Sequence, residues 1–223
     1  MFFNFQKYYR LKIPKKAIFI DVGANKGEWS KKILKKYNQC FIYVVEPIKN
    51  ITKIDNKRIK LINLAVDIKI KKNVSFYITK KNVTSSLLAQ NRTIIDKFKT
   101  FKSKNGLIHK RQDYDITKKI KTETITLKKL CELNKLKSIH YLKIDAEGND
   151  LNVLKSLGNK IKDLWGFELE TWNSKNTLWK KQKWLDECLD FIEKNNFSVV
   201  HKIIHGKGKT TDLICVNNKI LKI

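Results

Sequence analysis

The sequence lacks several features that would assign it to common classes of protein. Its 223 residues contain no apolar run close to the roughly 20 residues of a membrane-spanning helix. Residues 1–16 are aromatic and basic, but they lack the long apolar stretch and small-residue cleavage site of a signal peptide. We therefore expect a cytoplasmic protein without a transmembrane segment, and peripheral contact with a membrane stays open.

Cysteine and proline are also scarce. The four cysteines lie far apart, so no close pair suggests zinc binding or a redox motif, and we expect buried thiols. Two prolines, no internal repeat and no Gly/Ser-rich linker give no sign of a division into several domains. We expect an N-terminal segment, residues 1–16, followed by one domain, residues 17–223, which is long enough to bury a core without disulfides.

Arginine is rare for a chain with a net charge of +27, since it supplies only 4 of the 48 basic residues. A nucleic-acid surface would be expected to use more arginine, so a nucleic-acid partner is not favoured. Lysine, isoleucine and asparagine are abundant and share A/T-rich codons, which points to genome composition as the main cause. The positive field would still favour an anionic substrate, a glycan or a membrane surface.

What the sequence does contain is an alternation of apolar runs and amphipathic segments. The apolar runs predict strands at residues 17–22, 40–46, 59–64, 139–144, 164–169, 197–202 and 212–216. Helical spacing predicts helices at residues 27–37, 149–157 and 178–194, the last being the longest. Such alternation is typical of a parallel sheet covered on both faces. We therefore predict an α/β fold with a doubly wound, mostly parallel seven-stranded sheet, whose last strand follows a hairpin and runs antiparallel near the edge.

The middle of the chain departs from this rhythm. Residues 73–79 and 123–127 resemble extra strands, and residues 80–119 between them are polar, lysine-rich and weakly patterned. A segment of this length inside a compact domain is usually functional. We predict that residues 80–119 form an inserted lid or acceptor platform outside the sheet.

A glycine-bearing turn follows the first predicted strand. Gly23 and Gly27 let the backbone turn sharply between strand and helix, and the next strand ends in Glu46, a carboxylate that can accept ribose hydroxyl groups. No G-K-[ST] follows, so NTP hydrolysis is not expected, and the dinucleotide glycine pattern is absent. Together these features predict nucleoside binding, with S-adenosylmethionine as the leading cofactor.

Several motifs in the same order resemble the FkbM-type S-adenosylmethionine-dependent methyltransferases. They are FIDVGANKGEWS, VVEP, NLAVD, TSSL, TITLKKL, YLKIDAEGNDLNVLKSL and FELE, which together extend over residues 17–170. The resemblance implies a Rossmann-like class I methyltransferase fold, and it does not specify the acceptor. It implies cofactor binding by Asp21, Gly23, Ala24, Asn25, Gly27, Glu46, Pro47, Ala65, Val66, Asp67 and Asp145.

Candidate catalytic residues follow the later strands. Asp145 and Glu147 end the fourth parallel strand, where they could bind an acceptor hydroxyl or take its proton; alternatively, Asp145 caps the next helix. His205, placed in the loop after the sixth strand, is a further candidate base. Weaker candidates for the site are Glu168, Glu170, His109 and His140. Mg²⁺ bound by Asp145 with Glu168 or Glu170 is conceivable, but no His/Cys cluster supports it, so no metal is predicted.

The leading hypothesis is an O-methyltransferase acting on a hydroxyl of a sugar, glycan or small molecule, including an anionic one. An RNA methyltransferase would fit the charge, but Asp145-Ala-Glu stands where an (N/D)PP(Y/F) loop would serve amino-group methylation, and no Pro-Cys motif is present. A non-catalytic nucleotide-binding protein on the same fold would be expected to have lost its cofactor residues. The sequence indicates no oligomeric state.

Overall fold

A central seven-stranded sheet organises the computed structural model, which describes residues 4–97, 100–102, 106 and 108–222. The strand order is β12-β13-β11-β10-β1-β2-β3. The strands are β1 (Ile18–Val22), β2 (Phe41–Val45), β3 (Ile59–Ile62), β10 (Tyr141–Ile144), β11 (Gly166–Trp172), β12 (Phe197–His205) and β13 (Thr210–Asn217). Neighbours from β3 to β11 pair in parallel, whereas β13 pairs antiparallel with both β11 and β12. The predicted doubly wound, mostly parallel sheet is confirmed.

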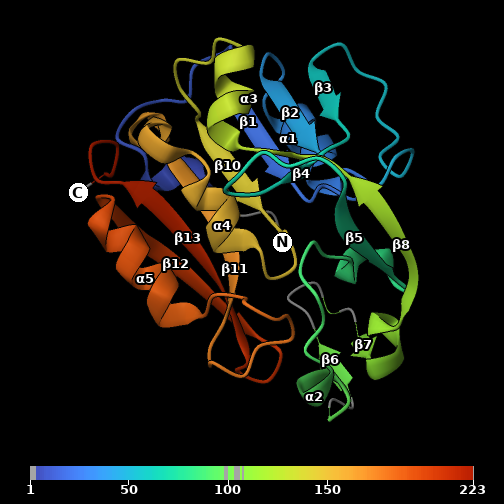
Figure 1. The fold of residues 1–223 in the computed structure, drawn as a ribbon. Helices are drawn as coiled ribbons and strands as arrows, with labels where there is room; N and C mark the ends of the chain where they lie inside the picture. Colours follow the sequence, from blue (N-terminus) through green and yellow to red (C-terminus); the bar gives the residue numbers. More distant parts are fainter. Residues whose placement is uncertain (1–3, 98–99, 103–105, 107, 223) are drawn as a thin grey trace.

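Helices cover both faces of this sheet. On one face, α3 (Leu127–Leu133), α4 (Asp150–Lys155) and α5 (Leu185–Lys194) pack over an aliphatic core, and Figure 1 shows α4 and α5 in front of the strands. On the other face, α1 (Glu28–Lys36) packs over a second core. Burial of both sheet faces explains why the strands are continuous apolar runs rather than alternating ones.

The N-terminal segment belongs to the second core. Phe5, in the 3-10 helix η1 (Phe5–Tyr8), is fully buried, and its ring stacks on Tyr141 of β10 with centroids 4.0 Å apart. The hydroxyl of Tyr9 donates to the carbonyl of His140 at 2.8 Å. The N–H of Lys222 donates to the carbonyl of Tyr8, so the two ends of the described chain lie side by side.

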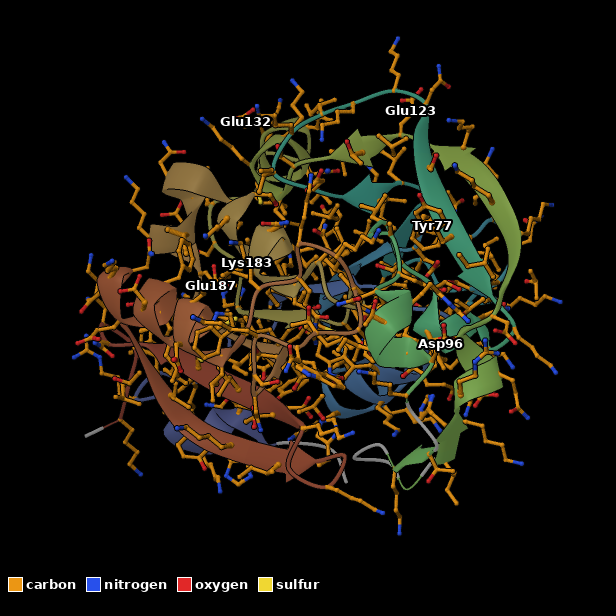
Figure 2. The ribbon with its side chains drawn as sticks, turned by 60° about the horizontal axis from the view of Figure 1, so that its bottom comes forward. Tyr77, Asp96, Glu123, Glu132, Lys183 and Glu187 are labelled. Atoms are coloured by element: carbon orange, nitrogen blue, oxygen red, sulfur yellow. The ribbon has the colours of Figure 1, made fainter. Side chains whose placement is uncertain are left out.

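An insertion between β4 (Ala65–Val66) and β9 (Thr124–Ile125) lies outside the seven-stranded sheet, to the right in Figure 1. It consists of β5 (Val74–Thr79), η2 (Asn82–Thr84), α2 (Arg92–Ile95), β6 (Thr100–Lys102), β7 (Ile108–Lys110), η3 (Arg111–Tyr114) and β8 (Ile116–Thr122). Strands β5 and β8 pair antiparallel. Figure 2 labels Asp96 in this insertion, whose carboxylate binds Arg92 at 2.6 Å and Arg111 at 3.1 Å.

A small hydrophobic cluster joins the insertion to the segment after β11. Its buried members are Ile95, Tyr114, Trp172, Leu178 and Trp179. Two backbone hydrogen bonds of 2.8 Å reinforce it, from the N–H of Asn91 to the carbonyl of Leu178 and from the N–H of Lys180 to the carbonyl of Ala89. The insertion therefore has a packed contact with the main domain.

Two boundary predictions are wrong. The helix predicted at residues 178–194 begins only at Leu185, because Leu178 and Trp179 turn into the cluster with the insertion and Lys181 adopts a positive φ of 64°. The strand predicted at residues 123–127 is reduced to Thr124–Ile125, since Thr126 already caps α3 by accepting the N–H of Lys129.

Candidate active site

A cavity opens at the carboxyl ends of β1, β2 and β10, between the sheet and the insertion. The space between its lining residues, open solvent included, is about 610 Å³. Its lining includes Gly23, Asn25, Glu46, Pro47, Ala65, Val66, Phe76, Asn82, Ser85, Leu87, Asp145, Glu147 and Asn149. Open α/β sheets bind ligands at this edge.

The turn after β1 is tightly fitted to the end of β10. Gly23 has a φ of +72°, and a Cβ there would collide with the backbone carbonyl of Asp145. Asn25, two residues after Gly23 in the same turn, also has a positive φ, of 49°. Its carbonyl accepts a hydrogen bond from the hydroxyl of Thr52. A side chain at position 23 would push the two strand ends apart and close the floor of the cavity.

Glu46 follows β2, and its buried carboxylate is held by two backbone N–H groups. Asn25 donates to Oε2 and Ile48 donates to Oε1, both at 2.9 Å. Burial raises the pKa of Glu46, and these two hydrogen bonds oppose the rise. Each carboxylate oxygen keeps a second lone pair, so Glu46 can still accept hydroxyl groups from a ribose.

The far side of the cavity is built partly by the insertion. Phe76 of β5 and the loop residues Ser85 and Leu87 line it opposite β4. The Asn149 side chain donates to the carbonyl of Val66 at 3.0 Å, which ties β4 to the start of α4. The apolar side chains of Phe76 and Leu87, together with strand β4 held by Asn149, suit the binding of a flat aromatic ring such as a nucleoside base.

Beneath the glycine turn lies a group of buried charges. Asp21 is fully buried; its Oδ2 accepts the hydroxyl of Ser30 at 2.7 Å, and its Oδ1 lies 3.5 Å from Nζ of Lys143. The same Nζ lies 3.2 Å from Oδ2 of Asp145. Lys143, paired in register with Asp21 across β1 and β10, therefore links a structural carboxylate to one that lines the cavity.

The turn from Asp145 to Gly148 is fixed by Asp150, whose carboxylate accepts the N–H groups of Ala146 at 3.2 Å and Gly148 at 3.0 Å. Within this turn, Glu147 has a φ of +48°, and its carbonyl accepts the hydroxyl of Ser86 at 2.7 Å. Burial, and then the charges of Glu170, Asp145 and Asp150, raise the pKa of Glu147 well above its usual value.

The comparison with protein families decides the classification. The Methyltransferase FkbM domain matches residues 21–199 of this chain. The chain belongs to this family of methyltransferases. The resemblance to the FkbM methyltransferases found in the sequence is confirmed. S-adenosylmethionine remains the cofactor that the sequence predicts.

Several solved structures have a similar arrangement at low sequence identity. A fibrillarin/Nop5p complex has a TM-score of 0.44 at 11% identity, covering 95% of this chain and 77% of that chain. TrmK of M. capricolum, solved with S-adenosyl-homocysteine, has a TM-score of 0.43 at 11% identity, covering 94% and 65%. A SAM-dependent methyltransferase from Aquifex aeolicus has a TM-score of 0.41 at 9% identity, covering 92% and 85%.

A search of the curated proteins gave no match. Among the described residues, no helix has the length and apolar character needed to cross a membrane.

The structure of this FkbM methyltransferase brings most of the predicted residues to one cavity. Those that line it are Gly23, Asn25, Glu46, Pro47, Ala65, Val66, Asp145 and Glu147. Four others lie beside or beneath the lining: Asp21, Ala24, Gly27 and Asp67. Gly27 faces Ile54 and Thr52, and the Asp67 carboxylate lies 3.4 Å from Nζ of Lys71.

The structure corrects two details of the predicted catalytic set. Asp145 does not cap α4, because that helix begins at Asp150 and the Asp145 carboxylate pairs with Lys143. His205 is not in a loop; it is the last residue of β12, and its ring binds Thr210 and Asp212 of β13.

The other histidines and Glu168 have neighbours within the fold. His140 accepts the N–H of Ile18 at 2.9 Å and packs against Trp165, and the Glu168 carboxylate accepts the hydroxyl of Tyr141 at 3.2 Å. His109 is buried in β7, with its ring near Tyr114.

Sequence reasoning missed several residues of the site. Lys143 is the only charged residue in the apolar strand Tyr141–Ile144, which could have marked it as a site residue. The sequence alone does not show which residues it faces. Ser85 and Leu87 belong to the TSSL motif, which was noted without a role. Phe76 and Asn149 gave no signal of their own, because they reach the cavity only through the fold.

Proposed function

We propose that this FkbM methyltransferase transfers the methyl group of S-adenosylmethionine to a hydroxyl oxygen of a sugar, glycan or other small molecule. The observation that carries the proposal is that one cavity is lined by Glu46, which follows β2, and by Asp145 and Glu147, which follow β10. A carboxylate that can bind a ribose and two acidic groups that can take part in proton transfer then line one ligand site.

The residues present fit the cofactor. Glu46 would accept the ribose hydroxyls, Phe76 and Val66 would contact the adenine, and the turn at Gly23 and Asn25 would hold the methionine end. When bound, S-adenosylmethionine supplies a methyl group on a positively charged sulfur. The carboxylate of Asp145, at the end of β10, favours that positive charge.

The acceptor end offers both kinds of hydrogen-bonding group that a hydroxyl needs. Glu147 lines the same cavity, and burial raises its pKa well above the usual value, which favours the protonated form that would donate to the acceptor oxygen. Asp145, half-buried and 3.2 Å from the Lys143 ammonium, can accept the hydroxyl hydrogen. A hydroxyl is donor and acceptor at once, which favours this acceptor over a group that only donates.

In this reaction the protein would align the acceptor hydroxyl with the methyl group and remove the hydroxyl proton. Asp145 would orient the hydroxyl and take the proton that it loses, and Lys143 would hold Asp145 in place. The insertion residues that line the cavity would exclude water from the reacting groups. Orientation and acid–base catalysis are the two contributions that such a site can make.

The proposal is tested in two steps. Calorimetry with S-adenosylmethionine and S-adenosylhomocysteine should show saturable binding, and no heat at millimolar ligand would contradict the site. The purified protein is then offered neutral sugars, sugar phosphates, amino sugars and RNA, and mass spectrometry searches each for an added CH₂. Methylation of a hydroxyl, abolished by Asp145→Asn but kept in the surface control Asp186→Asn, is the expected result. Methylation of an amino group or of an RNA base would overturn the choice of acceptor.

A further inference from the structure

Outside the cavity lining, three potential metal ligands converge from three adjacent strands. Glu170 of β11 and Asp212 of β13 are direct partners in the sheet register, and His205 ends β12 on the same hairpin as Asp212. One ligand atom from each residue lies within 4.8 Å of the other two. Asp212 is buried, and Glu170 and His205 are half-buried.

The spacing within this group fits shared coordination of an ion. Nε2 of His205 lies 3.3 Å from Oδ1 of Asp212, which is long for a charge-assisted hydrogen bond of about 2.7–2.9 Å. Two ligand atoms that each lie about 2.1 Å from one ion are roughly 3.0–3.4 Å apart. The distance is therefore compatible with two ligands of one ion.

The other ring nitrogen of His205 is held as in metal-binding histidines. Nδ1 lies 2.9 Å from the hydroxyl of Thr210, which is 1% exposed and fixes the ring. Metal-ligating histidines usually have their second nitrogen held by such a partner. This contact comes from outside the three ligands, and it directs Nε2 toward the two carboxylates.

We propose that Glu170, His205 and Asp212 bind one divalent cation next to the acceptor end of the cavity. One imidazole nitrogen with two carboxylate oxygens suits a first-row ion such as Mn²⁺, and three protein ligands leave coordination positions open. The described part of the chain offers no cysteine to this group, so a purely structural zinc site is not expected.

The cation would have a role in the proposed methyl transfer, and this role rests on the proposed function. β11 pairs with β10, so Glu170 lies on the strand next to the one that Asp145 follows, and its charge contributes to the raised pKa of Glu147. An ion in this place could bind acceptor oxygens in its open positions and lower the pKa of the hydroxyl that is methylated. A sugar with neighbouring hydroxyls is the acceptor class that such an ion holds best.

Metal binding can be measured without acceptor or cofactor, so its failure is distinguishable from failure of the methyltransferase proposal. The full chain, free of any histidine tag and treated with EDTA, is titrated with Mn²⁺, and free Mn²⁺ is followed by electron paramagnetic resonance. We expect about one bound ion per chain and a rise in the melting temperature. His205→Gln and Glu170→Gln should each weaken binding by at least tenfold, whereas His201→Gln, on the exposed part of the same strand, should bind as the wild type does.

Circular dichroism checks that each variant folds, and the half-buried Glu170 provides a variant that does not disturb the core. Absence of saturable Mn²⁺ binding to the wild type at millimolar concentration would overturn the proposal. Unchanged binding in folded Glu170→Gln and His205→Gln would overturn it as well. Loss of methyl transfer in His205→Gln without any ion binding would assign His205 to proton transfer with Asp212 instead.

Discussion

Glu46 is already positioned before any ligand binds. Its two oxygens accept the N–H groups of Asn25 and Ile48, so the carboxylate both shapes the glycine turn and faces the cavity. A buried carboxylate in this arrangement is costly to replace, because two backbone donors lose their acceptors at once.

We predict that Glu46→Gln weakens S-adenosylhomocysteine binding by about 1–3 kcal/mol, or roughly 5- to 150-fold. The amide is nearly isosteric, but its NH₂ group would face one of the two N–H donors and could not accept a ribose hydroxyl. Calorimetry gives the affinity, and thermal melting gives the cost to stability. Binding equal to that of the wild type would remove Glu46 from the ribose site.

Asp145 provides the second prediction at this scale. Asp145→Asn keeps the shape of the side chain but removes its negative charge, so turnover should fall by about 10²-fold or more. Cofactor affinity should change much less than the rate. Steady-state kinetics with the acceptor found by mass spectrometry tests this, and circular dichroism checks the fold. A fully active, stable variant would move proton removal to another group, with Glu147 and His205 next to be tested.

The individual site residues differ in how far the sequence could predict them. Glu46 and Asp145 were predictable, since each directly follows a buried strand and strand ends meet at one edge of a parallel sheet. Lys143 was not, because its role depends on register: it pairs with Asp21, which lies 122 residues earlier in the sequence on the neighbouring strand. No local pattern carries that pairing.

At the scale of elements, the turn between β10 and α4 depends on one acid. Asp150 accepts the N–H groups of Ala146 and Gly148, and burial together with the charge of Asp145 raises its pKa to about 7. The unfolded chain has the ordinary aspartate pKa of about 3.9. Between these two values the folded protein holds a proton that the unfolded chain releases.

Stability should therefore fall as the pH rises from about 4 to about 7, and this contribution should level off above pH 7. A difference of about three pKa units corresponds to at most about 4 kcal/mol. Urea unfolding of wild type and Asp150→Asn across this range measures the contribution of Asp150 together with its effect on Glu147, whose pKa the charge of Asp150 helps to raise. Parallel pH profiles for the two proteins would refute the assignment.

The insertion is the element whose role depends most on contacts distant in sequence. Its Ile95 is fully buried in the cluster with Trp172, Leu178 and Trp179, while Ile108 on the same insertion is 59% exposed. Asn82, Ser85 and Leu87 line the cavity. A bound cofactor would therefore contact the insertion directly.

We predict that trypsin cuts first within residues 80–119 and that S-adenosylhomocysteine slows this cutting. Ile95→Ala should speed it, since loss of a buried isoleucine side chain costs about 2–5 kcal/mol of packing. The exposed control Ile108→Ala should be cut at the wild-type rate. A first cut within residues 139–170 would show that the stable part of the chain lies elsewhere.

Element boundaries show where local pattern stops being enough. The helix predicted at residues 178–194 begins only at Leu185, because Leu178 and Trp179 pack against the insertion and the N–H of Lys180 donates to the carbonyl of Ala89. That choice depends on a segment about 90 residues earlier. The strands of the main sheet were predictable because burial on both faces makes them continuous apolar runs.

For the whole molecule, charge is distributed and not focused. Figure 2 shows nitrogen-tipped side chains around the entire outline, in keeping with the net charge of +27. Two of the residues that line the cavity, Asp145 and Glu147, are acidic by contrast. Composition alone predicts the overall charge and suggests an anionic partner, but only the fold shows that these two acidic residues line one cavity and that Asp145 is paired with Lys143.

The four buried cysteines can report on local unfolding, because each becomes reactive only when the structure around it opens. Cys40 lies in the core beneath α1, whereas Cys131, Cys188 and Cys215 lie in the core on the opposite face of the sheet. Burial raises the pKa of Cys131 to about 11 and that of Cys188 to about 12, so these thiols are shielded and protonated at once. Alkylation can then proceed only as fast as the surrounding structure opens. The order in which iodoacetamide labels the four thiols should reveal on which face of the sheet the helices separate first, without any cysteine having to be introduced.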